Sequence, residues 1–206
     1  AHRKTDISPE LVDMTTDFLR SLAEIAPTHV ILGNHDGNLR NDSRQDAITP
    51  IVDAMENPNV FLYKESGEHH IGSDVVLNVL SVFDKDNWIT EPTDENKINV
   101  ALYHGSVAGC KTETGFLLEH GIDISKLQNF DYAMLGDIRK TNQCLDHEGR
   151  VRYCGSTIQQ NHGETNDKGF LIWDIEDQDN FEVTHHQILN INPFITVVLT
   201  PKGKVP

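Results

Sequence analysis

The residues with the clearest chemical potential follow a short apolar run at positions 30–32. This run predicts a buried strand, and Gly33 marks its end. In open α/β sheets, ligands bind at the carboxyl ends of the strands. There Asn34 offers an amide oxygen, a hard ligand suited to Mg²⁺ or Mn²⁺, and His35 offers an imidazole. The alternative interpretation is a plain turn, in which Asn, Asp and Gly accept unusual backbone angles.

Two further apolar runs end in the same way. Residues 98–103 lead into His104, and residues 130–135 lead into Gly136 and Asp137. A histidine at the end of one strand is more often structural than functional when it stands alone. Three apolar strands that each deliver a small residue and a potential ligand instead favour one composite site.

The elements that must position these strand ends alternate between helix and strand. Ser8 as N-cap and Pro9 at the first helical position predict a helix that ends before Pro27. Its apolar residues recur at spacings of three and four, which is typical of an amphipathic helix. Further helices are predicted at 47–55 and around 116–118, and further strands at 60–63, 75–82, 151–156, 169–175, 181–189 and 194–199.

Length and composition bound the possible functions. With 206 residues, 37% hydrophobic and 24% charged, the chain has the composition of a single soluble globular domain. The formal net charge of −15 argues against a module that holds nucleic acid by charge alone. Divalent metal ions in a site would make the local electrostatic field positive, so an acidic chain is still compatible with a metal-dependent nuclease. Three cysteines without a C-x-x-C pair predict free thiols, and without a signal peptide or membrane span we expect a cytoplasmic protein.

Four strings of this sequence resemble the calcineurin-like metallophosphoesterases: Gly33-Asn34-His35-Asp36, Tyr103-His104-Gly105, Leu135-Gly136-Asp137-Ile138-Arg139 and Tyr153-Cys154-Gly155-Ser156. The block 153–164, with Lys168-Gly169-Phe170 after it, is similar to the nuclease subunits of double-strand-break repair, the SbcD-type bacterial proteins and their bacteriophage relatives. The resemblance runs over nearly the whole chain. It implies an α/β fold of the four-layer α/β/β/α sandwich type.

The resemblance also implies a site and partners. Asn34 and His104 would bind metal, and His35 would stabilise the transition state or protonate the leaving alcohol. Two divalent ions, in this family usually Mn²⁺ with Mg²⁺ as the other candidate, would activate water and clamp a phosphodiester. The implied substrate is DNA, and the implied partner is an SMC-like ATPase, with a homodimer also expected. The setting would be the cytoplasm of a bacterial cell or phage-infected host.

The sequence departs from the family at its start. The opening Asp-x-His strand and the following Gly-Asp pair are not in it, and residues 1–4 resemble the tail of the second of these motifs. His2 would then be an auxiliary catalytic histidine near the phosphate. We therefore expect residues 1–199 to form an N-terminally truncated metallophosphoesterase domain that lacks its first βαβ segment. Residues 200–206 would begin a linker to a further C-terminal region.

A second departure lies in the last motif, where the family usually has Gly-His-x-His. Asp137 stands at the first histidine position and still offers oxygen to a hard metal. Arg139 cannot bind metal, because guanidinium has no acceptor lone pair, but it suits contact with a phosphate. His162, in the family-like block, is a candidate for the rim of the site. The alternatives are a degenerate site on a non-catalytic scaffold that docks the ATPase or DNA ends, or a phosphoesterase for a small molecule or phosphoprotein.

Overall fold

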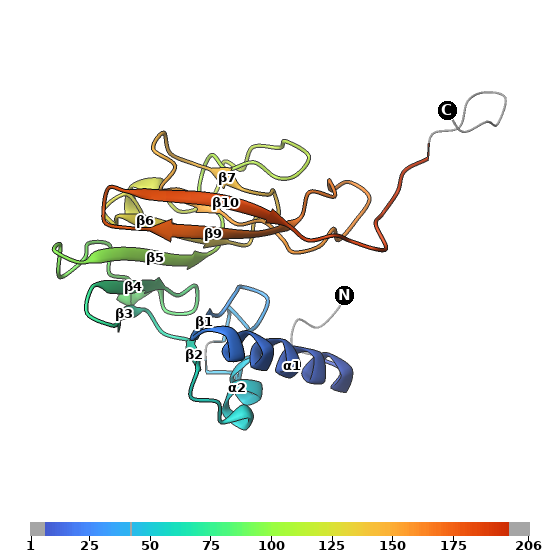
Figure 1. Ribbon diagram of the computed structural model, residues 1–206, viewed down its shortest axis with the longest axis horizontal. Coiled ribbons are helices and arrows are strands. Elements are labelled where there is room, and N and C mark those ends of the chain that lie inside the picture. The colour runs from blue at the N-terminus through green and yellow to red at the C-terminus, as the bar shows by residue number, and fades with distance from the viewer. Residues whose placement is uncertain (1–6, 42, 198–206) are drawn as a thin grey trace.

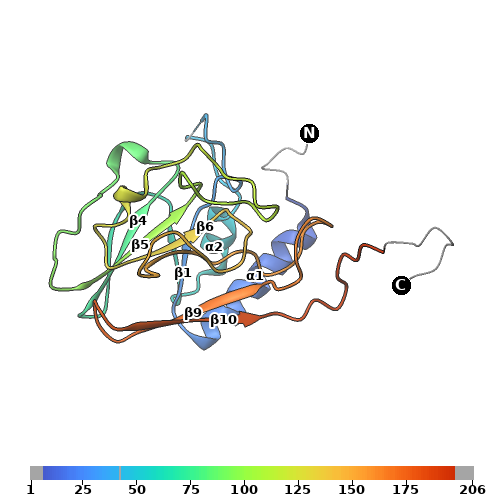
Figure 2. The same ribbon diagram turned by 90° about the horizontal axis from the view of Figure 1, so that it is seen from above.

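The computed structural model describes residues 7–41 and 43–197 and shows a mixed α/β chain (Figures 1 and 2). In chain order the elements are α1 (Pro9–Ile25), β1 (Thr28–Ile31), α2 (Thr49–Met55), β2 (Val60–Tyr63), β3 (Gly67–Ile71), β4 (Val75–Leu80), η1 (Lys85–Asn87), β5 (Ile98–His104), η2 (Ile124–Lys126), β6 (Tyr132–Gly136), β7 (Gln143–Cys144), β8 (Val151–Tyr153), β9 (Gly169–Ile175) and β10 (Phe181–Gln187). These elements confirm most of the predicted helices and strands.

A six-stranded sheet with the order β3-β4-β5-β6-β8-β7 holds the core. Its strands β4, β5, β6 and β8 run parallel, and β3 and β7 pair antiparallel at the two edges. Val100, Ala101 and Leu135 are at most 2% exposed, as expected for parallel strands covered on both faces. In the register of β5 and β6, His104 lies opposite Gly136. The predicted ligands after these strands therefore leave the sheet at one edge.

The helix α1 packs against a separate two-stranded parallel sheet, β1–β2. Its N-cap is Ser8, whose Oγ accepts a hydrogen bond from Leu11 N at 3.3 Å. Only part of the predicted apolar stripe is buried: Leu19 is 6% exposed, whereas Met14 is 67% exposed. No helix in the described part of the chain has the length and apolar character needed to cross a membrane.

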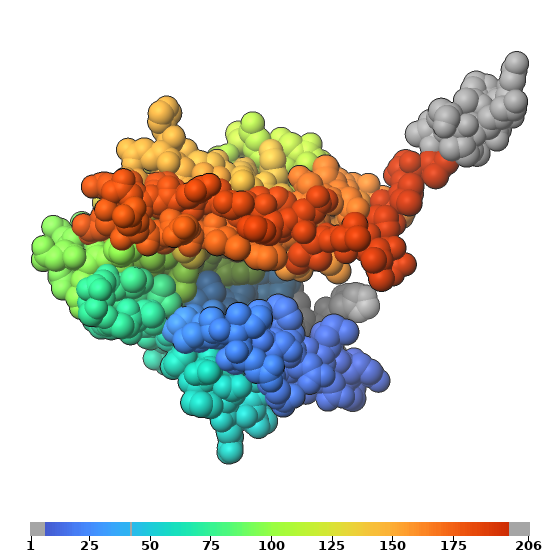
Figure 3. All heavy atoms as spheres, viewed as in Figure 1, coloured from blue at the N-terminus to red at the C-terminus, as the bar shows by residue number. Residues whose placement is uncertain are grey.

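The β9–β10 hairpin forms a second two-stranded sheet. Figure 1 shows it at the opposite end of the molecule from α1 and α2, with β4 and β5 between them. Tyr132 anchors it to the large sheet, because its hydroxyl donates to the carbonyl of Asp177 at 2.6 Å and its ring packs edge-on against Phe181. On the other face Phe170 and Ile172 are 45% and 46% exposed. In the space-filling view the hairpin lies on the surface of the molecule (Figure 3).

The helix predicted around residues 116–118 is wrong. The chain there makes a tight turn closed by a β-bridge between Lys111 and Leu117. Gly115 has a φ of 83°, a left-handed conformation that does not continue a helix. The Thr112 hydroxyl accepts a hydrogen bond from Phe116 N at 3.2 Å, which is the local competition that threonine offers to helical backbone bonds.

The strand predicted at 194–199 is also wrong over its described residues, 194–197, which have no strand partner. The side chain of Gln159 occupies this backbone instead: its Oε1 accepts from Phe194 N at 2.9 Å, and its Nε2 donates to Phe194 O at 3.3 Å. An amide side chain thus replaces a neighbouring strand. Residues 198 and 199 lie outside the described part of the chain.

A stacked group on β1, β2 and β3 gives the fold an expected pH dependence. His29 Nδ1 lies 2.8 Å from the Tyr63 hydroxyl, and the rings of Tyr63 and His69 stack at 3.9 Å. Burial lowers the pKa of His29, and burial together with the neighbouring His29 lowers that of His69, both from an ordinary value of 6.5. Below that value the unfolded chain binds protons that the folded chain rejects, so stability falls as the pH drops through 6.5 toward the folded pKa values.

Urea unfolding at about pH 8 and about pH 5.5 measures this effect. The variant with His29→Gln and His69→Gln should lose part of the difference between the two conditions. His70→Gln is the matched control, because His70 is exposed on the same strand as His69 and should leave the difference unchanged. An unchanged pH dependence in the double variant would show that the stacked histidines do not titrate on unfolding.

Candidate functional site

Three predicted ligands converge at the strand ends. Asn34 follows β1, His104 ends β5, and Asp137 follows β6. Asn34 Nδ2 donates to Asp137 Oδ1 at 3.3 Å, and His104 Nε2 lies 3.9 Å from the same oxygen. The structure therefore brings an amide, an imidazole and a carboxylate together, and the first and last of these residues are 103 positions apart in sequence.

Two glycines make room for the imidazole of His104. A Cβ on Gly33 would lie 2.8 Å from His104 Nε2, and a Cβ on Gly136 would lie 2.6 Å from His104 Nδ1. Both distances are shorter than side chains tolerate, so any larger residue at either position must displace the ring. The small residue that ends each of these strands is therefore a packing requirement of the histidine between them.

Two local features mark Asn34 and Asp137 as unusual. Asn34 Oδ1 is buried and has no hydrogen-bond partner among the described residues. Asp137 has a φ of 91°, a strained conformation for a residue with a side chain, and strain of this kind clusters at functional sites. Asp36 has a structural role beside them, since its Oδ2 accepts from Gly33 N at 2.7 Å and closes the turn after β1.

Burial dominates the electrostatics of His104. It lowers the pKa of the imidazole, while the carboxylates of Asp137 and Asp36 act in the opposite direction without reversing the shift. The charge of His35 adds to the lowering. His104 is therefore neutral at neutral pH and carries the lone pair that a metal ligand or proton acceptor needs.

The residue types are those that bind a divalent ion through mixed oxygen and nitrogen ligands, with the Asn34 amide turned so that its Nδ2, not its Oδ1, faces Asp137. Asn34 contributes an unpaired buried oxygen, Asp137 a carboxylate, and His104 a neutral imidazole. Among residues 7–41 and 43–197, no group of three His, Cys, Asp or Glu side chains is placed to hold a metal, so a metal bound by His104 and Asp137 would need the amide of Asn34 as a third ligand. A second ion would need ligands beyond these three residues.

The other predicted site residues are placed differently. His35 is exposed and close enough to influence His104. His162 is exposed as well, and its ring packs edge-on against Phe194 at 4.9 Å. Arg139 donates from Nη1 to Glu164 Oε1 at 3.1 Å, so its guanidinium is held by a carboxylate on the protein. His2 lies outside the described residues.

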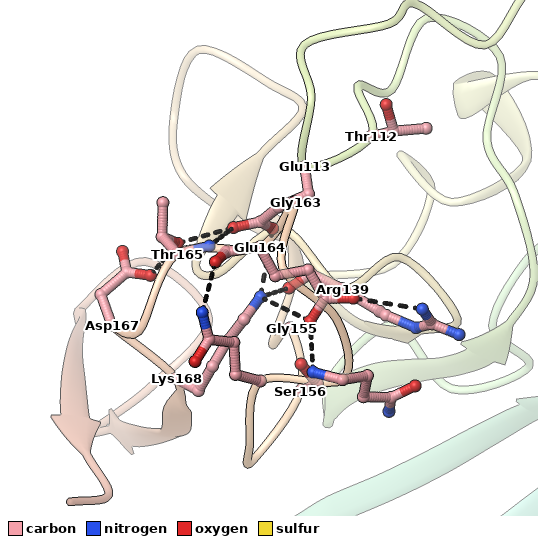
Figure 4. Close-up of polar contacts among 12 residues, drawn as sticks. Thr112, Glu113, Arg139, Gly155, Ser156, Gly163, Glu164, Thr165, Asp167 and Lys168 are labelled. Carbon is pink, nitrogen blue, oxygen red and sulfur yellow. Dashed lines mark hydrogen bonds and ion pairs between the residues drawn. The ribbon is translucent and has the colours of Figure 1, made fainter. Parts of the chain in front are cut away.

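A buried ion cluster braces the loop that carries Asp137 (Figure 4). The side chain of Lys168 is 0% exposed. Its Nζ donates to the carbonyl of Arg139 at 2.7 Å and to Glu113 Oε2 at 3.1 Å, and it lies 3.7 Å from Glu164 Oε2. One ammonium thus ties together the segments around 113, 139 and 164 directly beside the candidate site.

The neighbours of Glu113 favour its charged form. Burial acts to raise its pKa, but hydrogen bonds from Thr165 and Lys168 and the charge of Lys168 outweigh burial, so its pKa lies below the ordinary value. Sequence reasoning did not identify Glu113 or Lys168 as part of the site. Apart from the position of Lys168 shortly after the family-like block, the sequence carries no signal for a pair separated by 55 positions.

No protein-family model matches the chain. The chain is 37% identical to the uncharacterized protein R555 of Acanthamoeba polyphaga mimivirus, in a match that covers 84% of this chain. It spans only 14% of the length of that protein. A crystal structure with 13% sequence identity is similar with a TM-score of 0.49, over 84% of this chain and 72% of that one. At these values neither match establishes a family or a function for the chain.

Proposed function

We propose that this chain is part of a metal-dependent phosphodiesterase that acts on DNA, of the calcineurin-like metallophosphoesterase type. The observation that carries the proposal is the convergence of Asn34, His104 and Asp137 at the ends of three apolar strands. The buried, unpaired oxygen of Asn34 supports it further, because an acceptor without a donor suits a cation.

In this proposal Asn34, His104 and Asp137 hold a divalent ion, Mn²⁺ or Mg²⁺. When bound, such an ion supplies the positive charge that activates water and polarises a phosphoryl oxygen. The neutral His104 keeps its lone pair available because burial suppresses its protonation. His35, exposed beside His104, is positioned to donate a proton to the leaving alcohol or to stabilise its developing charge.

The finer features of the resemblance extend the proposal. They are the four-layer α/β/β/α sandwich, a second metal ion with ligands from residues other than these three, a cytoplasmic setting, an SMC-like ATPase partner and a homodimer. The mixed α/β class of the described residues is compatible with the sandwich. The acidic chain, with its net charge of −15, would rely on metal in the site to approach a polyanion.

A non-catalytic scaffold is the second candidate. Two observations favour it: Arg139 stands where the family usually has a metal-binding histidine, and the guanidinium pairs with Glu164. A scaffold would keep the fold and the strand ends while its metal affinity is weak. The two candidates therefore differ in metal binding before they differ in catalysis.

Calorimetric titration with Mn²⁺ tests the proposal directly. Asn34→Ala should weaken binding by at least about 100-fold. Mutating a residue that only hydrogen-bonds to a metal ligand already lowers metal affinity by about 10–100-fold, and losing a ligand itself should cost more. Asn34→Asp, which keeps an oxygen donor, should retain binding. Asn129→Ala, on an exposed loop, is the control that should match the wild-type chain.

Hydrolysis then separates the activities. Mn²⁺-dependent degradation of DNA by the wild-type chain would support the nuclease. Turnover of an aryl phosphate monoester with intact DNA would indicate a small-molecule or phosphoprotein phosphoesterase. Wild-type binding of Mn²⁺ that Asn34→Ala leaves unchanged would overturn the assigned metal site, and no binding at all would favour the scaffold.

A further inference from the structure

A pocket of about 260 Å³ opens beside the candidate site, with Asp137 at one side. Arg139, Thr112, Thr114 and Asn161 also line it. The pocket lies over the loop that Lys168 braces, and Figure 4 shows Arg139 extending from this loop beside Glu164. A ligand in this pocket would therefore adjoin whatever binds at Asp137.

The guanidinium of Arg139 is oriented by one hydrogen bond and keeps further N–H donors for a ligand. The side chain is 48% exposed, and its Nη1 donates to Glu164 Oε1 at 3.1 Å. A guanidinium has five N–H donors in a rigid plane, so a single bond to a carboxylate orients the plane and leaves donors for a ligand. Glu164 is itself rigid, since the same oxygen accepts from Asn161 Nδ2 at 2.8 Å.

Of the three acidic residues that line the pocket, Asp137 belongs to the candidate metal site, and Glu113 and Glu164 are engaged by hydrogen bonds within the protein. The side chain of Glu164 is 3% exposed and that of Glu113 is 11% exposed. Their oxygens accept hydrogen bonds from Lys168, Thr165, Asn161 and the backbone of Gln160. Glu113 Oε2 and Glu164 Oε2 lie toward the ammonium of Lys168, whereas Glu164 Oε1 holds Arg139, whose half-exposed side chain lines the pocket. An anionic ligand with a planar pair of oxygens suits this arrangement.

We propose that this pocket is a second anion subsite, in which Arg139 binds a phosphate group next to the phosphodiester held by Asn34, His104 and Asp137. The inference rests on the proposed function for the identity of its neighbour and adds a specific ligand to it. The phosphate comes from the nucleic-acid strand, either as an adjacent internal phosphodiester or as a terminal phosphate.

Fluorescence anisotropy with short thymidine oligonucleotides tests the subsite, with one probe carrying a 5′-terminal phosphate and one without it. Binding is measured in EDTA, which prevents metal-dependent cleavage and separates this test from that of the hydrolytic function. Arg139→Gln should weaken binding of at least one probe by about tenfold or more, the usual worth of hydrogen bonds to a charged group. The slope of log affinity against log salt concentration should also become shallower by about 0.7, the change expected when one phosphate contact to a single strand is lost.

Two variants control for charge and for folding. Lys140→Gln removes one positive charge from the residue next to Arg139 and should bind like the wild-type chain. Arg139→Lys keeps the charge opposite Glu164 but loses the planar fork, so it should bind with intermediate affinity. Thermal unfolding of each variant shows whether the loop remains folded.

The two probes distinguish the possible sources of the bound phosphate. A loss confined to the phosphorylated probe assigns a terminal phosphate, and an equal loss with both probes assigns an internal phosphodiester. Equal binding by Arg139→Gln and the wild-type chain, or no wild-type binding of either probe, would overturn the subsite. If Arg139→Gln binds more weakly while the wild-type chain hydrolyses nothing with Mn²⁺, the subsite stands and the nuclease proposal fails.

Discussion

Replacing Lys168 with methionine should lower the free energy of unfolding by about 3–5 kcal/mol, the cost of removing one partner from a buried ion pair. The wholly buried Nζ contacts Glu113 and lies near Glu164, and it also holds the carbonyl of Arg139. Without it, two largely buried carboxylates and a backbone oxygen lose their cation. Since domains are stable by about 5–15 kcal/mol, this single change should remove a large part of the total.

Urea unfolding followed by tryptophan fluorescence measures this loss, because the chain has two tryptophans as reporters. Lys85→Met, at an exposed lysine, is the matched control and should shift stability by about 0.5 kcal/mol or less, as surface substitutions do. Adding Glu113→Gln to Lys168→Met should recover part of the loss, because the second change removes one of the uncompensated charges. A Lys168→Met chain within about 1 kcal/mol of the wild-type chain would contradict an ionised, stabilising cluster.

Replacing Gly136 with alanine should reduce Mn²⁺ affinity and any metal-dependent hydrolysis by about 100-fold. The new Cβ would lie 2.6 Å from His104 Nδ1, and Gly33 lies so close on the other side that a Cβ on it would be 2.8 Å from His104 Nε2. A displacement of about 1 Å at a reacting centre is enough for a loss of this size. Calorimetry and hydrolysis of an aryl phosphodiester measure the two effects.

A double-mutant cycle with His104→Ala separates displacement of the imidazole from general damage. Once His104 is an alanine, the added methyl group at residue 136 has no ring to displace, so the second change should cost little further affinity. Additive losses would show that Gly136→Ala acts through the sheet rather than through His104. Gly33→Ala, which approaches the ring at Nε2, should behave in the same way.

Local patterns in the sequence determined most of the elements. Ser8 and Pro9 set the start of α1, and the apolar runs 98–103 and 130–135 became buried parallel strands. The same patterns placed Asn34, His104 and Asp137 after strands. Parallel β5 and β6 bring His104 and Asp137 to one edge of the large sheet, and Asn34 reaches them from the separate β1–β2 sheet. These features depend on a residue and its close neighbours in the chain, so the sequence alone contains them.

The tertiary structure decided what long-range contacts control. The pairing of Glu113 with Lys168 spans 55 positions, and no local pattern predicts which carboxylate a buried lysine will meet. The exposed side of α1 and the use of Gln159 in place of a last strand likewise depend on which surfaces meet after folding. The sequence by itself determined that three potential ligands end three strands. Only the packed structure decided that two glycines lie against His104 and that Arg139 lines a pocket, because close approach and burial arise between segments far apart in the chain.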